Sequence, residues 1–119
     1  MRYKRCPVIP EGLVRVVNAL YADFDRRADQ IKSPERAKEE GGLDFLPQDR
    51  IRRMQILNQI LVKAVYAVCE ESIAETMLFD LKNDIGYEKS ALSLVMSHKT
   101  YYHRKRSVKL EAARRLGLM

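Results

Sequence analysis

Apolar residues in the first third of the chain recur at steps of three and four, the spacing of one face of an α-helix. Segment 11–32 follows Pro10, and most of its charged residues fall off this stripe. The pattern predicts one amphipathic helix over 11–32, with an inner face made by Leu13, Val16, Val17, Leu20, Tyr21, Phe24, Ala28 and Ile31.

A second and longer helical pattern starts near Pro47, and neither Gly nor Pro occurs between Gln48 and Ile85. It predicts a long central helix over 48–82, or two helices that meet near Glu70–Ser72. A helix of that length without internal caps suits self-association or a hairpin scaffold, although burial in an ordinary core is the simpler interpretation. The apolar positions at helical spacing are Ile51, Met54, Leu57, Leu61, Val65, Val68, Ile73 and Met77.

Between these patterns, Ser33 followed by Pro34 is typical of a helix start, and the polar residues after it favour a short surface turn. Gly41 and Gly42 end that turn. In the loop that follows, over 43–47, we expect the apolar side chains to lie against the core.

The end of the chain has a helix stop over 83–86, a short apolar pattern over 87–95 and a long basic segment that runs to Leu116. We interpret these as a short helix, a turn at Met96 and Ser97, and a last helix that Ser97 caps. No segment has the alternation of a strand. The prediction is an all-α fold of four to five helices and one domain over 1–119, with a helical scaffold and oligomerisation part over 1–83 and a helix-turn-helix over 84–119.

The net charge of +6 is concentrated at one end of the chain, and this distribution points to a function for the last helix. Residues 1–97 hold 15 basic and 15 acidic side chains, whereas residues 98–119 hold 7 basic side chains and Glu111 alone. A neutral body with one basic end is typical of a protein that binds an acidic partner, nucleic acid first. Arg114 and Arg115 suit the negative end of a helix dipole, but the cations over 99–106 lie near the helix start, where that dipole disfavours them.

Stepping the last helix by about 100° per residue separates an inner from an outer face. The inner face predicted for the core holds Tyr101, Tyr102, Val108, Ala112, Ala113 and Leu116. The outer face can read base edges with Lys, Arg and Thr and can neutralise phosphates. The free N–H groups at the helix start also favour a phosphate, and a tyrosine hydroxyl on the rim can bind one. The predicted DNA-binding residues are Ser97, His98, Lys99, Thr100, Tyr102, His103, Arg104 and Arg106.

The same residues carry a family resemblance. The resemblance lies in segment 86–92, in the Ser-x-x-Thr-Tyr-Tyr stretch over 97–102 with basic residues after it, and in the closing Leu-Gly-Leu over 116–118. In these stretches the C-terminal part of the chain resembles small phage-encoded late-gene regulators of the RinA and ArpU type. Their helix-turn-helix is similar to region 4 of sigma factors. The resemblance covers about a third of the chain, and Gly86 to Ser97 is shorter than the usual sigma-like first helix and turn. It implies promoter DNA binding in a bacterial host, with contact to RNA polymerase.

Other chemistries find little support in the sequence. Cys6 and Cys69 lack partners at zinc-ligand spacing, and His98 and His103 are five residues apart, so no metal site is predicted. There is no phosphate-binding glycine loop or nucleophile elbow, so neither an enzyme nor a cofactor is expected. The acidic residues Glu70, Glu71, Glu75, Asp80 and Asp84 are interpreted as solvated helix surface.

The sequence therefore predicts a transcriptional regulator that binds specific double-stranded DNA, encoded by a phage or prophage and acting as a homodimer or higher homo-oligomer. With no apolar run long enough for a membrane span and no signal peptide, we expect a cytoplasmic location. Two alternatives stay open: a DNA-recognising subunit resembling a phage small terminase, and a helical module that docks on an acidic protein. The basic start, with Arg2, Lys4 and Arg5, is either a solvated terminus or an arm for the minor groove.

Overall fold

The computed structural model describes residues 8–33 and 48–119, and within them it is all-helical without a strand. The predicted all-α class is therefore confirmed. The interpretations of segment 34–47 and of the basic residues over 2–5 lie outside the described residues. The elements are α1 (Glu11–Ala22), α2 (Phe24–Lys32), α4 (Gln48–Val68), α5 (Glu71–Lys82), two short 3-10 turns η1 (Tyr87–Lys89) and η2 (Ala91–Leu94), and α6 (His98–Arg115).

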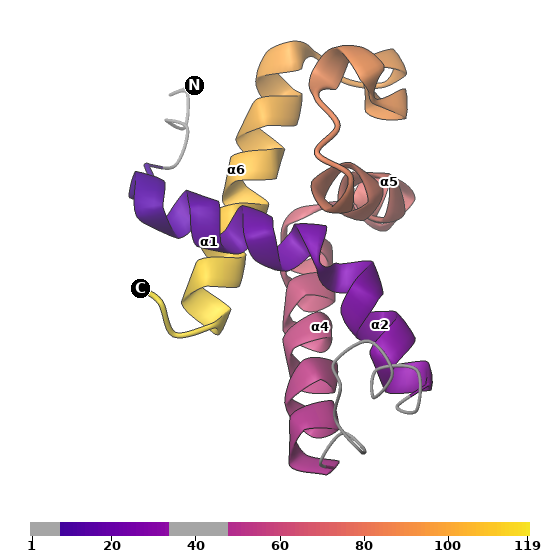
Figure 1. Ribbon diagram of the computed structural model, residues 1–119. Helices are drawn as coiled ribbons and strands as arrows, with labels where there is room; N and C mark the ends of the chain where they lie inside the picture. Colours follow the sequence, from indigo (N-terminus) through magenta and orange to yellow (C-terminus); the bar gives the residue numbers. More distant parts are fainter. Residues whose placement is uncertain (1–7, 34–47) are drawn as a thin grey trace.

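The helix predicted over 11–32 is divided at Asp23 into α1 and α2, as the change of direction in Figure 1 shows. Asp23 has φ −94° and ψ 4°, yet its backbone N–H still bonds the Ala19 carbonyl at 3.1 Å. Its carboxylate accepts two 2.5 Å hydrogen bonds from Arg26. This pair lowers the pKa of Asp23, with the hydrogen bond from Arg26 as the main cause. The division is a local bend, after which α2 buries Arg27 and Gln30, while Val16, predicted to lie on the inner face of α1, is 45% exposed.

A buried cation fastens this bend to α4. Arg27 is only 4% exposed, although the sequence pattern put it off the apolar stripe. Its Nε donates to Asn58 Oδ1 at 2.8 Å and its Nη2 donates to the Leu20 carbonyl, while the Asn58 amide donates to the Phe24 carbonyl at 3.3 Å. Because a buried polar group is costly without a partner, these reciprocal bonds fix where α2 lies on α4.

The long helical pattern over 48–82 forms two helices, α4 and α5, so the second of the two predicted arrangements is correct. Glu70 is extended, with φ −61° and ψ 148°, and its carbonyl accepts the first bonds of α5 from Ile73 and Ala74, both at 3.0 Å. The break turns α5 steeply away from α4, so that α5 is seen nearly end-on in Figure 1 while α4 lies along the page. An unbroken helix could not bring the apolar face of α5 back over the core.

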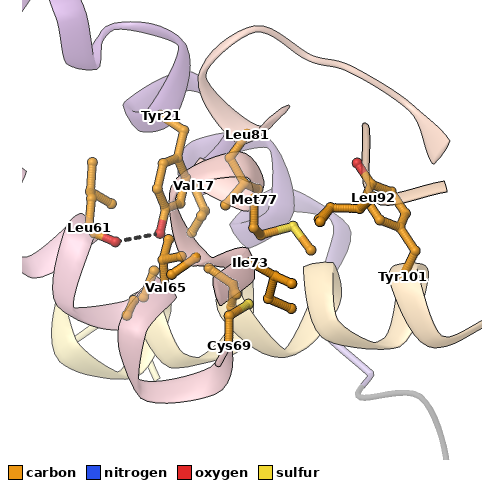
Figure 2. Packing of buried hydrophobic residues seen from close by; sticks show 14 of the residues in the cluster. Val17, Tyr21, Leu61, Val65, Cys69, Ile73, Met77, Leu81, Leu92 and Tyr101 are labelled. Carbon is orange, nitrogen blue, oxygen red and sulfur yellow. Dashed lines mark hydrogen bonds between the residues drawn. The ribbon is translucent and has the colours of Figure 1, made fainter. Parts of the chain in front are cut away.

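The core lies where α1, α4, α5 and α6 meet (Figure 2). Tyr21 is fully buried at its centre and donates its hydroxyl to the Leu61 carbonyl at 2.9 Å. α6 packs most extensively on α4, and α1 lies across α6, as Figure 1 shows, and also packs on α5. The buried cluster comprises Val17, Tyr21, Leu61, Ala64, Val65, Cys69, Ile73, Ala74, Met77, Leu81, Leu92, Tyr101, Val108, Ala112 and Ala113.

Replacing Arg27 with Ala should destabilise the protein by about 2–3 kcal/mol, because it leaves the buried Asn58 oxygen without a donor. The neighbouring and more exposed Arg26→Ala is the matched control, with an expected cost of less than about 1 kcal/mol. Urea unfolding followed by circular dichroism measures both. Equal costs for the two variants would contradict the structural role given to Arg27.

Burial raises the pKa of the Tyr21 hydroxyl above its usual value near 10. Above pH 10 the unfolded chain therefore loses a proton that the folded chain keeps, so folding stability falls as pH rises. Tyr21→Phe removes this contribution. Between about pH 10.5 and 12, the unfolding free energy of the variant should therefore fall less steeply than that of the unmodified chain, by about 1.4 kcal/mol per pH unit. Denaturant titrations at several pH values test this, and an unchanged slope would show that the hydroxyl ionises alike in both states.

Candidate nucleic-acid interface

The basic helix α6 is reached from α5 through a compact corner over 83–97. The predicted stop over 83–86 is confirmed, since Asp84 takes the left-handed conformation with φ 51° and the Ile85 N–H bonds back to the Asp80 carbonyl at 3.0 Å. The short helix predicted over 87–95 is wrong, because these residues form η1 and η2. Ser90 lies between the two turns in an extended conformation, with φ −79° and ψ 141°, and so interrupts helical hydrogen bonding.

Asp80 is the polar centre of this corner. Its side chain is 1% exposed, so the prediction that it lies on solvated helix surface is wrong; Asp84 and the three glutamates are exposed, as predicted. The Asp80 carboxylate accepts a 2.5 Å hydrogen bond from the Ser90 hydroxyl and a 2.9 Å bond from the Tyr101 hydroxyl. One buried carboxylate thus joins α5, the 3-10 corner and α6.

Tyr101 and Lys105 complete the polar cluster from the α6 side. The Tyr101 hydroxyl also lies 3.0 Å from the Ile85 carbonyl, and Lys105 Nζ donates to the same carbonyl at 2.6 Å. Burial, and then the hydrogen bond to Asp80, raise the pKa of Tyr101. Burial lowers the pKa of Lys105, while the nearby Asp80 and Asp84 oppose that change. The Asp80 carboxylate, the Tyr101 hydroxyl and the Lys105 ammonium group therefore form one connected polar network.

The predicted cap of the basic helix is confirmed. Ser97 Oγ accepts from the Thr100 N–H at 3.2 Å and donates to Thr100 Oγ1 at 2.9 Å. Tyr87 fixes the residues on either side of Ser97. Its hydroxyl donates to the Met96 carbonyl at 2.8 Å, and its ring packs edge-on against His98 at 5.0 Å. The start of α6 is therefore fixed by side chains on both sides of the turn.

At its other end, α6 stops in a Schellman motif. Gly117 has φ 75°, its N–H bonds the Arg114 carbonyl at 3.0 Å, and the Leu118 N–H bonds the Ala113 carbonyl at 2.9 Å. Glycine adopts this left-handed conformation without the steric cost that a side chain would bring. The closing Leu-Gly-Leu of the sequence is thus a helix stop.

The residues predicted to bind DNA fall into two groups by exposure. Five are exposed at the cap and on the first turns of α6, namely Ser97, His98, Lys99, Thr100 and Tyr102. Three are half-buried further along, namely His103, Arg104 and Arg106. Figure 1 shows the start of α6 at one end of the molecule, clear of the crossing with α1.

Two details of the predicted faces need correction. Tyr102 was assigned to the packing face together with Tyr101, but it is 45% exposed while Tyr101 is fully buried. Of the two tyrosines, only Tyr101 donates a hydrogen bond to Asp80. His103 is a predicted DNA-binding residue, yet its Nε2 is buried and has no hydrogen-bond partner among the described residues.

Arg104 is engaged within the protein. Its guanidinium donates to the Val68 carbonyl at 3.0 Å and to Glu70 Oε1 at 3.3 Å. The last carbonyls of a helix have no partner in the helix itself and carry partial negative charge, so they attract a cation. Arg104 therefore fastens α6 to the end of α4, which sequence spacing alone does not indicate.

Two hollows flank the start of α6. One of about 340 Å³ is lined by the aromatic side chains of Tyr87, His98 and Tyr102 together with Asp84, Gly86, Glu88 and Lys89. The other, of about 510 Å³, lies between α5 and η2 and includes Ile73, Leu92, Thr100 and Arg104 in its walls. Val95, which also lines this second hollow, is 69% exposed.

Comparisons with protein-family models, with curated proteins and with solved structures find no match for this chain. Over 8–33 and 48–119, no helix is long and apolar enough to cross a membrane. The same described segments bring together no group of three or more His, Cys, Asp or Glu side chains that could hold a metal ion.

Replacing Asp80 with Asn should cost about 1.5–3 kcal/mol of folding stability, because two hydroxyl donors lose a charged acceptor. The exposed Asp84→Asn is the control and should change stability by less than about 0.5 kcal/mol. Thermal and urea unfolding measure both variants. If Asp80→Asn is as stable as the unmodified chain, the carboxylate does not hold the corner.

Proposed function

We propose that the chain binds double-stranded DNA through the first turns of α6 and regulates transcription of phage or prophage genes. The observation that carries the proposal is the position of the cations. Lys99 lies in the first turn of α6, where the helix dipole disfavours positive charge, and Arg106 follows two turns later on the same side of the helix. A polyanion that contacts this end of the helix offsets that cost.

The chemistry of the exposed turns suits a DNA groove. Lys99 and Arg106 are seven residues apart, so their backbone positions share one side of the helix. Lysine and arginine can bond guanine O6 and N7 in the major groove, and each well-placed pair discriminates by about 1–3 kcal/mol. The free N–H groups of the first turn favour a phosphate.

The contacts inside the protein narrow the set of DNA-binding residues. Arg104 and Lys105 bond backbone carbonyls of the protein, so we assign them to positioning α6. Ser97 acts as the cap, and Thr100 presents its methyl group, since its hydroxyl bonds Ser97. The proposed reading surface is thus His98, Lys99, Thr100, Tyr102 and Arg106, with α5 and the 3-10 corner supporting α6 in a unit similar to a helix-turn-helix.

The regulatory role and the contact with RNA polymerase rest on the resemblance to the RinA and ArpU type of regulator. Proteins that recognise DNA with a helix-turn-helix commonly bind as two subunits related by a two-fold axis. On α4 the exposed Ile56 and Tyr66 offer apolar surface for a second copy. We therefore propose a homodimer or a higher homo-oligomer.

Lys99→Ala and Arg106→Ala should each weaken duplex binding by about 1–3 kcal/mol. Each should also reduce the slope of log affinity against log salt by about 0.9 if the side chain contacts a phosphate. Fluorescence anisotropy with a duplex selected from a random pool, at several salt concentrations, measures both effects.

Arg53→Ala is the matched control, because Arg53 is an exposed cation in the first turns of α4. Figure 1 shows that the start of α4 and the start of α6 lie at opposite ends of the molecule. It should leave both affinity and salt slope unchanged. Duplex affinity that does not depend on salt concentration would contradict the proposed surface, as would equal losses of affinity in all three variants.

The exposed Val95 in the wall of the 510 Å³ hollow favours one rival, a module that docks on a protein partner. A chain that retains no duplex at low salt would support that rival. A terminase-like subunit would instead bind DNA as a ring of many copies, and a mass measured in solution distinguishes it from a dimer.

A further inference from the structure

We propose that Tyr102 reads the C5-methyl group of a thymine in the major groove, an inference that rests on the proposed DNA-binding function. Tyr102 differs sharply from its neighbour. Tyr101 donates its hydroxyl to Asp80 inside the protein, whereas the Tyr102 ring stands on the surface of the first turns of α6. A large apolar ring at this site is therefore available to a ligand.

The ring of Tyr102 is held in place without being covered. Its centroid lies 4.6 Å from the His98 ring and 6.1 Å from the Tyr101 ring, and His98 in turn packs on Tyr87. A side chain that is already ordered loses little conformational entropy on binding. Tyr66 and Phe79 are similarly exposed, but neither packs on another aromatic ring among the described residues.

The position of Tyr102 along α6 places it between the two cations of the proposed surface. Lys99, Tyr102 and Arg106 are spaced by three and four residues, so they follow one stripe of the helix. If the two cations contact phosphates or guanines on either side, the ring between them faces base edges. Affinity would then come from the cations and selectivity from the ring.

The hollow beside the ring indicates which group enters. Asp84 and Glu88 line it together with Tyr102, and their two carboxylates outnumber the one lysine there, Lys89, so a phosphate meets net repulsion. A neutral base edge meets no such repulsion. Thymine presents the only methyl group of the four standard bases in the major groove, and an aromatic ring is an apolar surface that such a methyl group contacts favourably.

The test uses the best duplex from a random selection and a set of copies in which each thymine is replaced singly by deoxyuridine. This change removes one methyl group and keeps base pairing. With the unmodified chain, one replacement should weaken binding about fourfold, the value expected for one buried carbon. The other replacements should have little effect.

Tyr102→Ala should bind the thymine duplex about fourfold more weakly and should no longer distinguish thymine from uracil at that position. Tyr102→Phe keeps the ring and should keep the distinction. Phe79→Ala is the matched control, since Phe79 is 53% exposed on α5, and it should bind as the unmodified chain does. Tyr102→Gln, which preserves helix propensity, provides a second variant if the alanine variant does not fold.

A Tyr102→Ala variant that keeps the thymine preference would overturn the inference, as would an unmodified chain that is indifferent to every uracil replacement. A preference for single strands that depends on Tyr102 would also overturn it, because the ring would then stack on an unpaired base. Absence of any duplex binding is a separate result that contradicts the proposed function itself.

Discussion

The buried carboxylate of Asp80 is the interaction on which the arrangement of the basic helix depends. A charge that is 1% exposed is tolerated only with strong partners, and here Ser90 and Tyr101 both donate to it. Since these three residues belong to α5, to the 3-10 corner and to α6, the bonds set the relative positions of all three. The buried polar cluster around Asp80 therefore determines the direction in which the exposed start of α6 points.

Two cations of α6 hold the helix against the rest of the protein, and two others lie on a different side of it, where we propose that DNA binds. Arg104 and Lys105 donate to backbone carbonyls of Val68 and Ile85, where orphan acceptors need a donor. Lys99 and Arg106 lie on the other side of the helix. A tally of charge by sequence cannot separate these sets, because neighbouring positions on a helix point in directions about 100° apart.

The sequence predicted the helical class, the Ser97 cap and the location of the charge, since each depends on local spacing or composition. It missed the roles of Asp80 and Arg27, because an acid or a base that is buried with a partner resembles a solvated one in a helical pattern. It also predicted a short helix over 87–95, where Ser90 bonds Asp80 and breaks the helical pattern. That bond joins residues ten positions apart and depends on tertiary packing.

The central claim is that the start of α6 is the surface that meets DNA, and a nuclear magnetic resonance titration tests it most directly. A ¹⁵N-labelled protein is titrated at low salt with the selected duplex, and shifts of backbone amides are mapped onto the fold. The account predicts the largest changes over 97–106 and small changes in α2 and the first half of α4. Changes centred on α2 or α4, or none with saturating duplex, would contradict it.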